Sequence, residues 1–283
     1  MNYLEVAITL PSAEADEAAT RLIAAGFPGL VLGESGPEDV PGAEATLKVY
    51  VSDVAAGERM PAIAAALAGL AYRQAQRTIR EEDWAESWKR FWHALRIGER
   101  LVVRPSWEEY DPADREVVIV LDPKQAFGTG THPTTRLVLA AIEHLVRPGD
   151  VVYDVGAGSG ILAVAAVLLG AARAEGVDTD PVAVAACEEN AALNRVADRC
   201  AWRVGSAAEL SGGADLVVAN ILAEVIVQLA PDLARLCGRD LVVSGIIARK
   251  AGDTRVALEA AGLGFVSQDQ EGDWVAQVFS RQG

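Results

Sequence analysis

The sequence has few cysteines and histidines, and this scarcity excludes several kinds of site. Its three cysteines and three histidines among 283 residues form no CxxC pair and show no metal-ligand spacing. This pattern argues against both a disulfide framework and a zinc site. The cysteines are Cys187, Cys200 and Cys237. We therefore expect a protein of a reducing compartment that binds no metal.

Long apolar runs and basic charge are also missing. No uncharged apolar run reaches the roughly 18 residues of a membrane helix, and the N-terminus carries acids where a signal peptide is basic. The formal net charge of −15 disfavours nucleic-acid binding and favours either a basic partner or a merely acidic surface. We expect a cytoplasmic protein without direct contact to a membrane or to nucleic acid.

Two domains and a linker are predicted. Residues 1–80 contain strand and helix patterns in the order βαββαβ, which predicts a small ferredoxin-like α+β domain. Such a domain is a common platform for holding another macromolecule, although the fold alone does not prove that role. In residues 97–283, strands alternate with helices and a hairpin closes the chain, which predicts an α/β domain with a largely parallel sheet.

The linker over residues 81–96 has an unusual content of tryptophan. Trp84, Trp88 and Trp92 recur every four residues, which places the three indoles on one face of a helix. We interpret this segment as a helix that docks on a neighbouring domain. The alternative is a helix whose indoles stack on a substrate.

A glycine-rich turn follows the apolar strand that ends at Val155. The turn contains Gly156, Gly158 and Gly160. These glycines let the backbone approach a ligand, and the start of the following helix favours a ligand carboxylate. Asp154, just before the turn, suits a ligand ammonium group. A dinucleotide fingerprint would have its third glycine where Ile161 stands, so a nicotinamide-dependent dehydrogenase is the weaker alternative.

An acid stands at the end of the next predicted strand. Asp178 is placed to accept hydrogen bonds from both hydroxyls of a ribose, as in nucleotide-binding sheets generally. Asp180 has a different predicted role, because it precedes Pro181 at the start of a helix and is suited to cap it. The turn and Asp178 together indicate an adenosine ligand.

Asn220 ends a later strand of the same predicted sheet. Its carboxamide oxygen can accept a hydrogen bond from a substrate amine. Enzymes that methylate planar base or amide nitrogens usually have Asn/Asp-Pro-Pro-aromatic here, whereas Ile221 and Leu222 follow Asn220 in this chain. This difference favours an aliphatic amine as the acceptor. The alternative is a buried asparagine that caps the following helix.

The segment 127–135, FGTGTHPTT, has two glycines and clustered hydroxyls that are unusual for a plain connection. We interpret it as a ligand lid, with Phe127 against an adenine or a pocket wall. His132 is either a base or, as is more frequent for a lone loop histidine, structural.

Several strings together resemble one family. LDPKQAFGTGTHPTT, DVGAGSGILAVAA, GVDTDP and VVANIL look like the ribosomal protein L11 methyltransferases (PrmA-type), and the likeness covers most of the chain. It implies a Rossmann-like seven-stranded methyltransferase domain and S-adenosylmethionine as the cofactor. By position, the family's cofactor contacts fall on Thr135, Gly156, Asp178 and Asn220, and we choose Asn220 as the residue that orients the amine.

The same resemblance implies a substrate. Members of the family trimethylate the N-terminal amine and certain lysine amines of large-subunit ribosomal protein L11, which we expect to be bound free or on the ribosome by a monomeric enzyme. Two alternatives stay open on the sequence. One is a methyltransferase for another protein or a small amine, and the other is a non-catalytic protein that binds S-adenosylmethionine.

Overall fold

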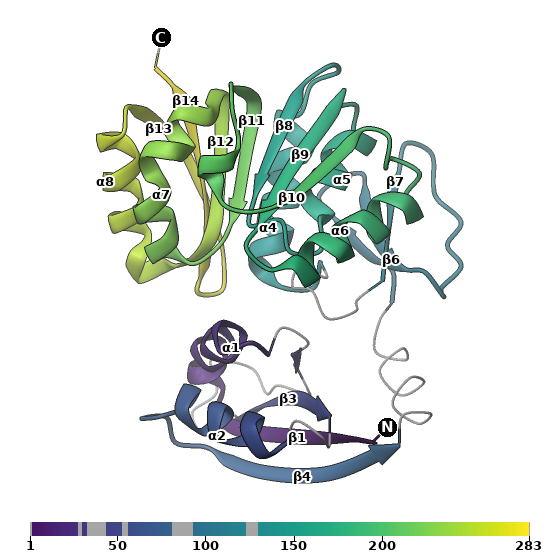
Figure 1. Cartoon of the computed structure of the whole chain (residues 1–283), viewed down its shortest axis with the longest axis vertical. Coiled ribbons are helices and arrows are strands. Elements are labelled where there is room, and N and C mark those ends of the chain that lie inside the picture. Colours follow the sequence, from purple (N-terminus) through teal and green to yellow (C-terminus); the bar gives the residue numbers. More distant parts are fainter. Residues whose placement is uncertain are drawn as a thin grey trace. The chain divides into compact units, whose positions relative to one another are not determined.

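The computed structural model describes residues 2–27, 30–32, 44–52, 56–80, 93–122 and 130–282. The chain divides into two compact units, Met1–Trp92 and His93–Gly283, so the division falls inside the predicted linker (Figure 1). Each unit has a core of its own. Within the described ranges, no helix combines the length and the apolar character needed to cross a membrane.

In its described residues, the N-terminal unit has a four-stranded antiparallel sheet in the order β2-β3-β1-β4 and two α-helices. Its elements are β1 (Asn2–Pro11), the short 3-10 helix η1 (Ser12–Glu14), α1 (Ala15–Ala24), β2 (Val31–Leu32), β3 (Glu44–Ser52), α2 (Ala56–Ala66) and β4 (Arg73–Arg80). The order of elements and of strands confirms the predicted ferredoxin-like fold.

Strand β1 shows how the sequence gives this sheet two different faces. Val6, Ile8 and Leu10 are at most 1% exposed and join the core formed with α1 and α2. Because side chains alternate along a strand, Glu5 points to the other face. There it accepts a hydrogen bond from the Tyr50 hydroxyl at 3.0 Å. The sheet therefore has an apolar face under the helices and a polar face on the other side.

The C-terminal unit contains a seven-stranded sheet in the order β10-β9-β8-β11-β12-β14-β13. The first five strands in this order are parallel, and β14 pairs antiparallel with both β12 and β13. The strands are β8 (Val151–Val155), β9 (Arg173–Asp178), β10 (Cys200–Val204), β11 (Ala214–Asn220), β12 (Cys237–Ile247), β13 (Leu263–Glu271) and β14 (Trp274–Arg281). The predicted seven-stranded Rossmann-like sheet and its closing hairpin are confirmed.

Helices cover both faces of this sheet (Figure 1). The α-helices are α4 (Pro133–Leu145), α5 (Ile161–Leu168), α6 (Pro181–Leu193), α7 (Ala223–Leu236) and α8 (Ala251–Ala260), and the short 3-10 helices are η4 (Ala207–Glu209) and η5 (Ala248–Lys250). Alternate residues of β11 belong to opposite cores: Leu216 and Val218 pack with α4 and α5, whereas Val217 and Ala219 pack with α7 and α8. This two-sided burial explains why the strands are apolar throughout.

Two elements differ from the sequence expectations. A second, three-stranded sheet contains β5 (Leu95–Ile97), β6 (Leu101–Pro105) and β7 (Val117–Leu121). The last residues of the predicted linker helix are therefore in a strand, because the backbone of 95–97 pairs with β6; residues 81–92 lie outside the described ranges. Helix α8 was not expected, since its buried face consists only of Ala251, Thr254 and Leu258 and gives a weak apolar period.

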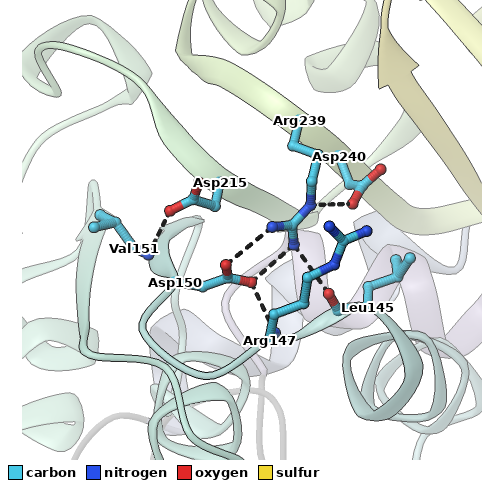
Figure 2. A network of polar contacts seen from close by, with 7 residues as sticks. All are labelled: Leu145, Arg147, Asp150, Val151, Asp215, Arg239 and Asp240. Atoms are coloured by element: carbon cyan, nitrogen blue, oxygen red, sulfur yellow. Dashed lines mark hydrogen bonds and ion pairs between the residues drawn. The ribbon is translucent and has the colours of Figure 1, made fainter.

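A polar cluster ties the loop before β8 to β12 (Figure 2). Arg239 donates from Nη1 and Nη2 to the two carboxylate oxygens of Asp150 at 2.9 and 2.8 Å, and from Nε to Asp240 at 2.8 Å. Nη2 also donates to the Leu145 carbonyl at 3.0 Å. Burial alone would raise the pKa of Asp150, but the Arg239 hydrogen bonds, with the Arg147 backbone N–H, hold this pKa below its usual value.

We predict that Arg239→Met lowers the free energy of unfolding by about 2–3 kcal/mol at pH 7, because it leaves the buried Asp150 carboxylate without its ion-pair partner. Arg203→Met is the matched control. Arg203 forms a 3.0 Å ion pair with Glu175, but its side chain is 51% exposed, so the loss should stay under about 1 kcal/mol. Urea unfolding of the three proteins measures both effects, and equal losses would contradict the assignment.

The pH dependence of the Arg239 effect has a defined sign. The pKa of Asp150 is lower in the folded protein than its usual value, so the contribution of its ion pair to stability is fully present above the unfolded pKa of about 4. This contribution is lost as the pH falls through the lower folded-state pKa. The gap in stability between the wild type and Arg239→Met should therefore narrow below about pH 4; a gap that widens in acid would contradict the assignment.

Candidate active site

Parallel strands bring the predicted site residues to one edge of the seven-stranded sheet. β8 lies between β9 and β11, with Asp154 opposite Gly176 on one side and Val218 on the other. The glycine turn, Asp178 and Asn220 follow or end these three strands. The carboxyl ends of parallel strands, where the strand order reverses, are the usual place for a ligand in an open α/β sheet.

The glycine turn has the backbone conformation that the sequence predicts. Gly156, Gly158 and Gly160 have φ angles of 76°, 57° and 76°, a backbone conformation that residues other than glycine rarely adopt. The turn is also fixed to the neighbouring strand, because Gly156 N–H donates to the Val177 carbonyl at 2.9 Å and Gly158 N–H donates to Asp178 Oδ2 at 2.9 Å. Turn and acid therefore form one rigid unit.

Gly160 also has a packing reason to be glycine. A Cβ on Gly160 would lie 2.9 Å from the Trp202 indole and 3.1 Å from Cys187 Sγ. A Cβ on Gly176 would lie 2.4 Å from the same indole. Trp202 thus packs over two glycines beneath the turn. Sequence reasoning missed this residue, since its separation from Gly160 along the chain gives no local signal.

The Asp178 carboxylate is held by backbone donors. Oδ2 accepts from Gly158 N–H, and Oδ1 accepts from Asp180 N–H at 3.0 Å. A carboxylate has about four lone-pair directions, so each oxygen retains capacity for a ligand hydroxyl. The separate role predicted for Asp180 is confirmed, because its side chain accepts from Val182 N–H at 2.8 Å and caps α6.

Two buried acceptors lie at this edge of the sheet. In the described part of the C-terminal unit, the buried side-chain atoms without a hydrogen-bond partner are Asp154 Oδ1 and Asn220 Oδ1. An unpaired buried acceptor costs about 1–3 kcal/mol, so such atoms need an explanation. They lie on neighbouring strands at the edge of the sheet where a ligand is expected, and a hydrogen-bond donor on a ligand would satisfy them.

The Asp154 carboxyl is fully buried. Its Oδ2 accepts from Ala163 N–H at 3.3 Å. Burial, opposed by this hydrogen bond and reinforced by the negative charge of Asp178, raises the pKa of Asp154 to about 7. A cation placed beside Asp154 would favour its ionised form.

Asn220 is oriented by Thr135. Its Nδ2 donates to Thr135 Oγ1 at 3.3 Å, and Thr135 is fully buried at the start of α4. The carboxamide oxygen is therefore the free end of the side chain. The alternative that Asn220 caps the next helix is wrong, because the N-cap of α7 is Leu222 and no side chain caps it.

The residue after Asn220 makes two close approaches to glycines. A Cβ on Gly156 would lie 2.3 Å from Ile221 Cγ2, and a Cβ on Gly245 would lie 2.1 Å from the Ile221 carbonyl oxygen. Ile221 N–H donates to the Ser244 carbonyl at 3.1 Å. Gly245 is thus needed for the turn that presents Asn220. The sequence signal that could have found it is a glycine inside a strand.

His132 has a structural role at the start of α4. It is the N-cap residue of this helix, and its Nδ1 accepts from Thr134 N–H and lies 2.8 Å from Thr134 Oγ1. The ring makes an edge contact with Trp274, with 4.8 Å between centroids. Burial, together with the charge of Arg136, lowers the pKa of His132 to about 4, so the imidazole is neutral at pH 7. Phe127 lies outside the described residues.

The residues present fit S-adenosylmethionine. Its ammonium group matches the free acceptor of Asp154, its ribose hydroxyls match Asp178, and its carboxylate suits the glycine turn at the start of α5. Within the described ranges, no cluster of three potential metal-ligating side chains is found.

This sheet and turn define a class, the Rossmann-like methyltransferases that use S-adenosylmethionine as the methyl donor. The chain belongs to the ribosomal protein L11 methyltransferase (PrmA) family, whose family model matches residues 2–282. The protein is therefore a methyltransferase, and S-adenosylmethionine is its cofactor.

Relatives with this name cover most or all of the chain. The ribosomal protein L11 methyltransferase of Pelotomaculum thermopropionicum is 49% identical over 232 residues, which is 80% of this chain and 75% of the relative. That of Heliobacterium modesticaldum is 37% identical across 100% of this chain and 98% of the relative. A crystal structure of ribosomal protein L11 methylase from Lactobacillus delbrueckii subsp. bulgaricus is 34% identical, with a TM-score of 0.63 over 68% of this chain and 100% of that one.

We predict that cofactor affinity rises with pH because of Asp154. Its pKa of about 7 in the free protein should fall when a ligand ammonium group binds beside it, so binding releases a proton below pH 7. The affinity for S-adenosylhomocysteine should then increase about tenfold from pH 6 to pH 8, as measured by isothermal titration.

Asp154→Asn is the control for this prediction. It should weaken binding at pH 8 and remove most of the pH dependence, because the residue no longer titrates. An unchanged pH dependence in Asp154→Asn would assign the titration to another group.

Proposed function

We propose that this enzyme trimethylates the N-terminal amine and lysine amines of ribosomal protein L11, free or on the ribosome. The names of its relatives support this substrate. The observation that carries the proposal at the level of the site is the free, buried carboxamide oxygen of Asn220. An amine nitrogen is a hydrogen-bond donor and fits an acceptor that nothing else in the described part of the chain occupies.

Two features favour an aliphatic amine over a planar nitrogen. Asn220 is followed by Ile221 and Leu222, so the Pro-Pro-aromatic element typical of enzymes that hold a flat acceptor is missing. The Asn220 oxygen also has a fixed direction, because Thr135 holds the amide nitrogen. One fixed acceptor suits a tetrahedral nitrogen in the first two transfers, since it orients a primary or monomethylated amine by one N–H and leaves the lone pair free to react. The neutral dimethylated amine has no N–H, so this hydrogen bond does not act in the third transfer.

The chain's own residues account for binding and orientation. When bound, S-adenosylmethionine supplies an electrophilic methyl group, and Asp154, Asp178 and the glycine turn would hold it. A lysine amine has a pKa near 10.4 in water, so the enzyme must select its neutral form. A site at the buried Asn220 oxygen desolvates the amine and lowers its pKa. Alignment of the amine then contributes most of the acceleration.

No side chain is assigned as a general base. His132 is the obvious candidate, but its Nδ1 is used in capping α4. We infer that the amine loses its proton to solvent as it enters the site, where desolvation lowers its pKa. The N-terminal unit would hold the protein substrate, and the net charge of −15 suits a basic ribosomal protein better than nucleic acid. We further propose that the enzyme acts as a monomer in the cytoplasm.

The test is methyl transfer to purified, unmethylated ribosomal protein L11, offered free and within ribosomes. Mass spectrometry after incubation with S-adenosylmethionine should find trimethylation at the N-terminal amine and at lysines of L11, with other ribosomal proteins unchanged. Transfer to a different protein or to small amines only would leave the methyltransferase assignment intact but overturn this substrate. Binding of cofactor without any transfer would overturn the proposed activity.

A further inference from the structure

Strand β7 is an edge strand whose outer side is satisfied by side chains instead of another strand. In the order β5-β6-β7, β7 pairs only with β6. The backbone groups on its other side would be unpaired, which is costly for a partly buried strand. Helix α6 lies there, and two asparagines provide the missing partners: Asn190 within the helix and Asn194 at its C-cap.

Asn194 mimics a neighbouring strand at Val120. Its Oδ1 accepts from Val120 N–H at 2.8 Å, and its Nδ2 donates to the Val120 carbonyl at 2.6 Å. Asn190, one helical turn earlier, accepts from Asp122 N–H at 3.3 Å. Four residues of helix rise about 6 Å and two residues of strand about 6.6 Å. The distance between the two asparagines therefore matches the distance between their partners, Val120 in β7 and Asp122 just after it.

Asn190 differs from Asn194 because it also reaches the cofactor turn. Its Nδ2 donates to the carbonyl of Ser159 at 2.9 Å, and Ser159 stands between Gly158 and Gly160. Asn190 is 2% exposed and Ser159 3%, so water cannot replace either hydrogen bond without a rearrangement. The same helix also contacts the turn through Cys187 Sγ, 3.3 Å from the Gly158 carbonyl.

We propose that Asn190 is a positioning residue for cofactor binding. One carboxamide joins the glycine turn to the end of β7, so that the backbone that meets the cofactor is held against the second sheet. The bond to Ser159 fixes the carbonyl in the middle of the turn and thereby the path of the backbone between Gly158 and Gly160. Asn194 caps the strand and also donates from Nδ2 to the Asn190 carbonyl at 2.7 Å. Among the described residues, its side chain makes no hydrogen bond to the turn, so it serves as the control.

The experiment compares Asn190→Ala with Asn194→Ala in the full-length enzyme. Each variant removes a carboxamide and frees a backbone group in β7 or directly after it, so both should lower the melting temperature. Only Asn190→Ala should also weaken the binding of S-adenosylhomocysteine, by at least about tenfold, because a displaced turn no longer has the shape that fits the cofactor. Asn194→Ala should keep the dissociation constant within about twofold. The KM for S-adenosylmethionine should rise in parallel in Asn190→Ala, with a smaller effect on kcat.

A second variant keeps the test decisive if Asn190→Ala does not fold. Asn190→Asp retains the shape and the acceptor for Asp122 N–H but loses the donor to Ser159. It should therefore also weaken cofactor binding by at least about tenfold. The proposal is overturned if either folded Asn190 variant binds S-adenosylhomocysteine as the wild type does. It is equally overturned if Asn194→Ala loses as much affinity at the same loss of melting temperature.

Discussion

The close approach of Ile221 to two glycines is the constraint on which the candidate site depends. Its side chain occupies the space that a Cβ on Gly156 would need, and its carbonyl occupies the space of a Cβ on Gly245. The cofactor turn and the turn after β11 can therefore come together only because both glycines lack a side chain. This contact sets where Asn220 stands relative to the glycine turn, and Thr135 then sets which end of the amide is free.

The two unpaired acceptors give the site its chemical character. Asp154 and Asn220 each retain a buried oxygen without a partner in the described part of the C-terminal unit, and both ligands of the proposed reaction carry nitrogen donors. The cofactor has an ammonium group and the substrate an amine. The two unpaired acceptors lower the stability of the free protein, and hydrogen bonds from the ligands would remove this destabilisation. By contrast, Arg239, which lies away from the site, has its partners within the protein.

Local patterns in the sequence were enough for the sheet, the glycine turn and the Asp180 cap, because each depends on residues close together in the chain. The contacts that complete the site join distant segments. Trp202 packs against Gly160, and Gly245 admits Ile221; neither pairing leaves a periodic signal. Strand β5 and helix α8 were missed for a related reason, since their apolar faces are short and their stability comes from neighbours. Phe127 lies outside the described residues, so its placement against an adenine or a pocket wall stays a prediction.

The central claim is that the free oxygen of Asn220 orients the methyl-accepting amine, and Asn220→Ala tests it most directly. With ribosomal protein L11 as the substrate, kcat should fall roughly 100-fold, while the dissociation constant of S-adenosylhomocysteine changes by less than about fivefold. The melting temperature should change little, because the variant removes an unpaired buried acceptor but also loses the hydrogen bond to Thr135. An unchanged kcat, or a loss of activity that merely follows a loss of folding or of cofactor binding, would contradict the account.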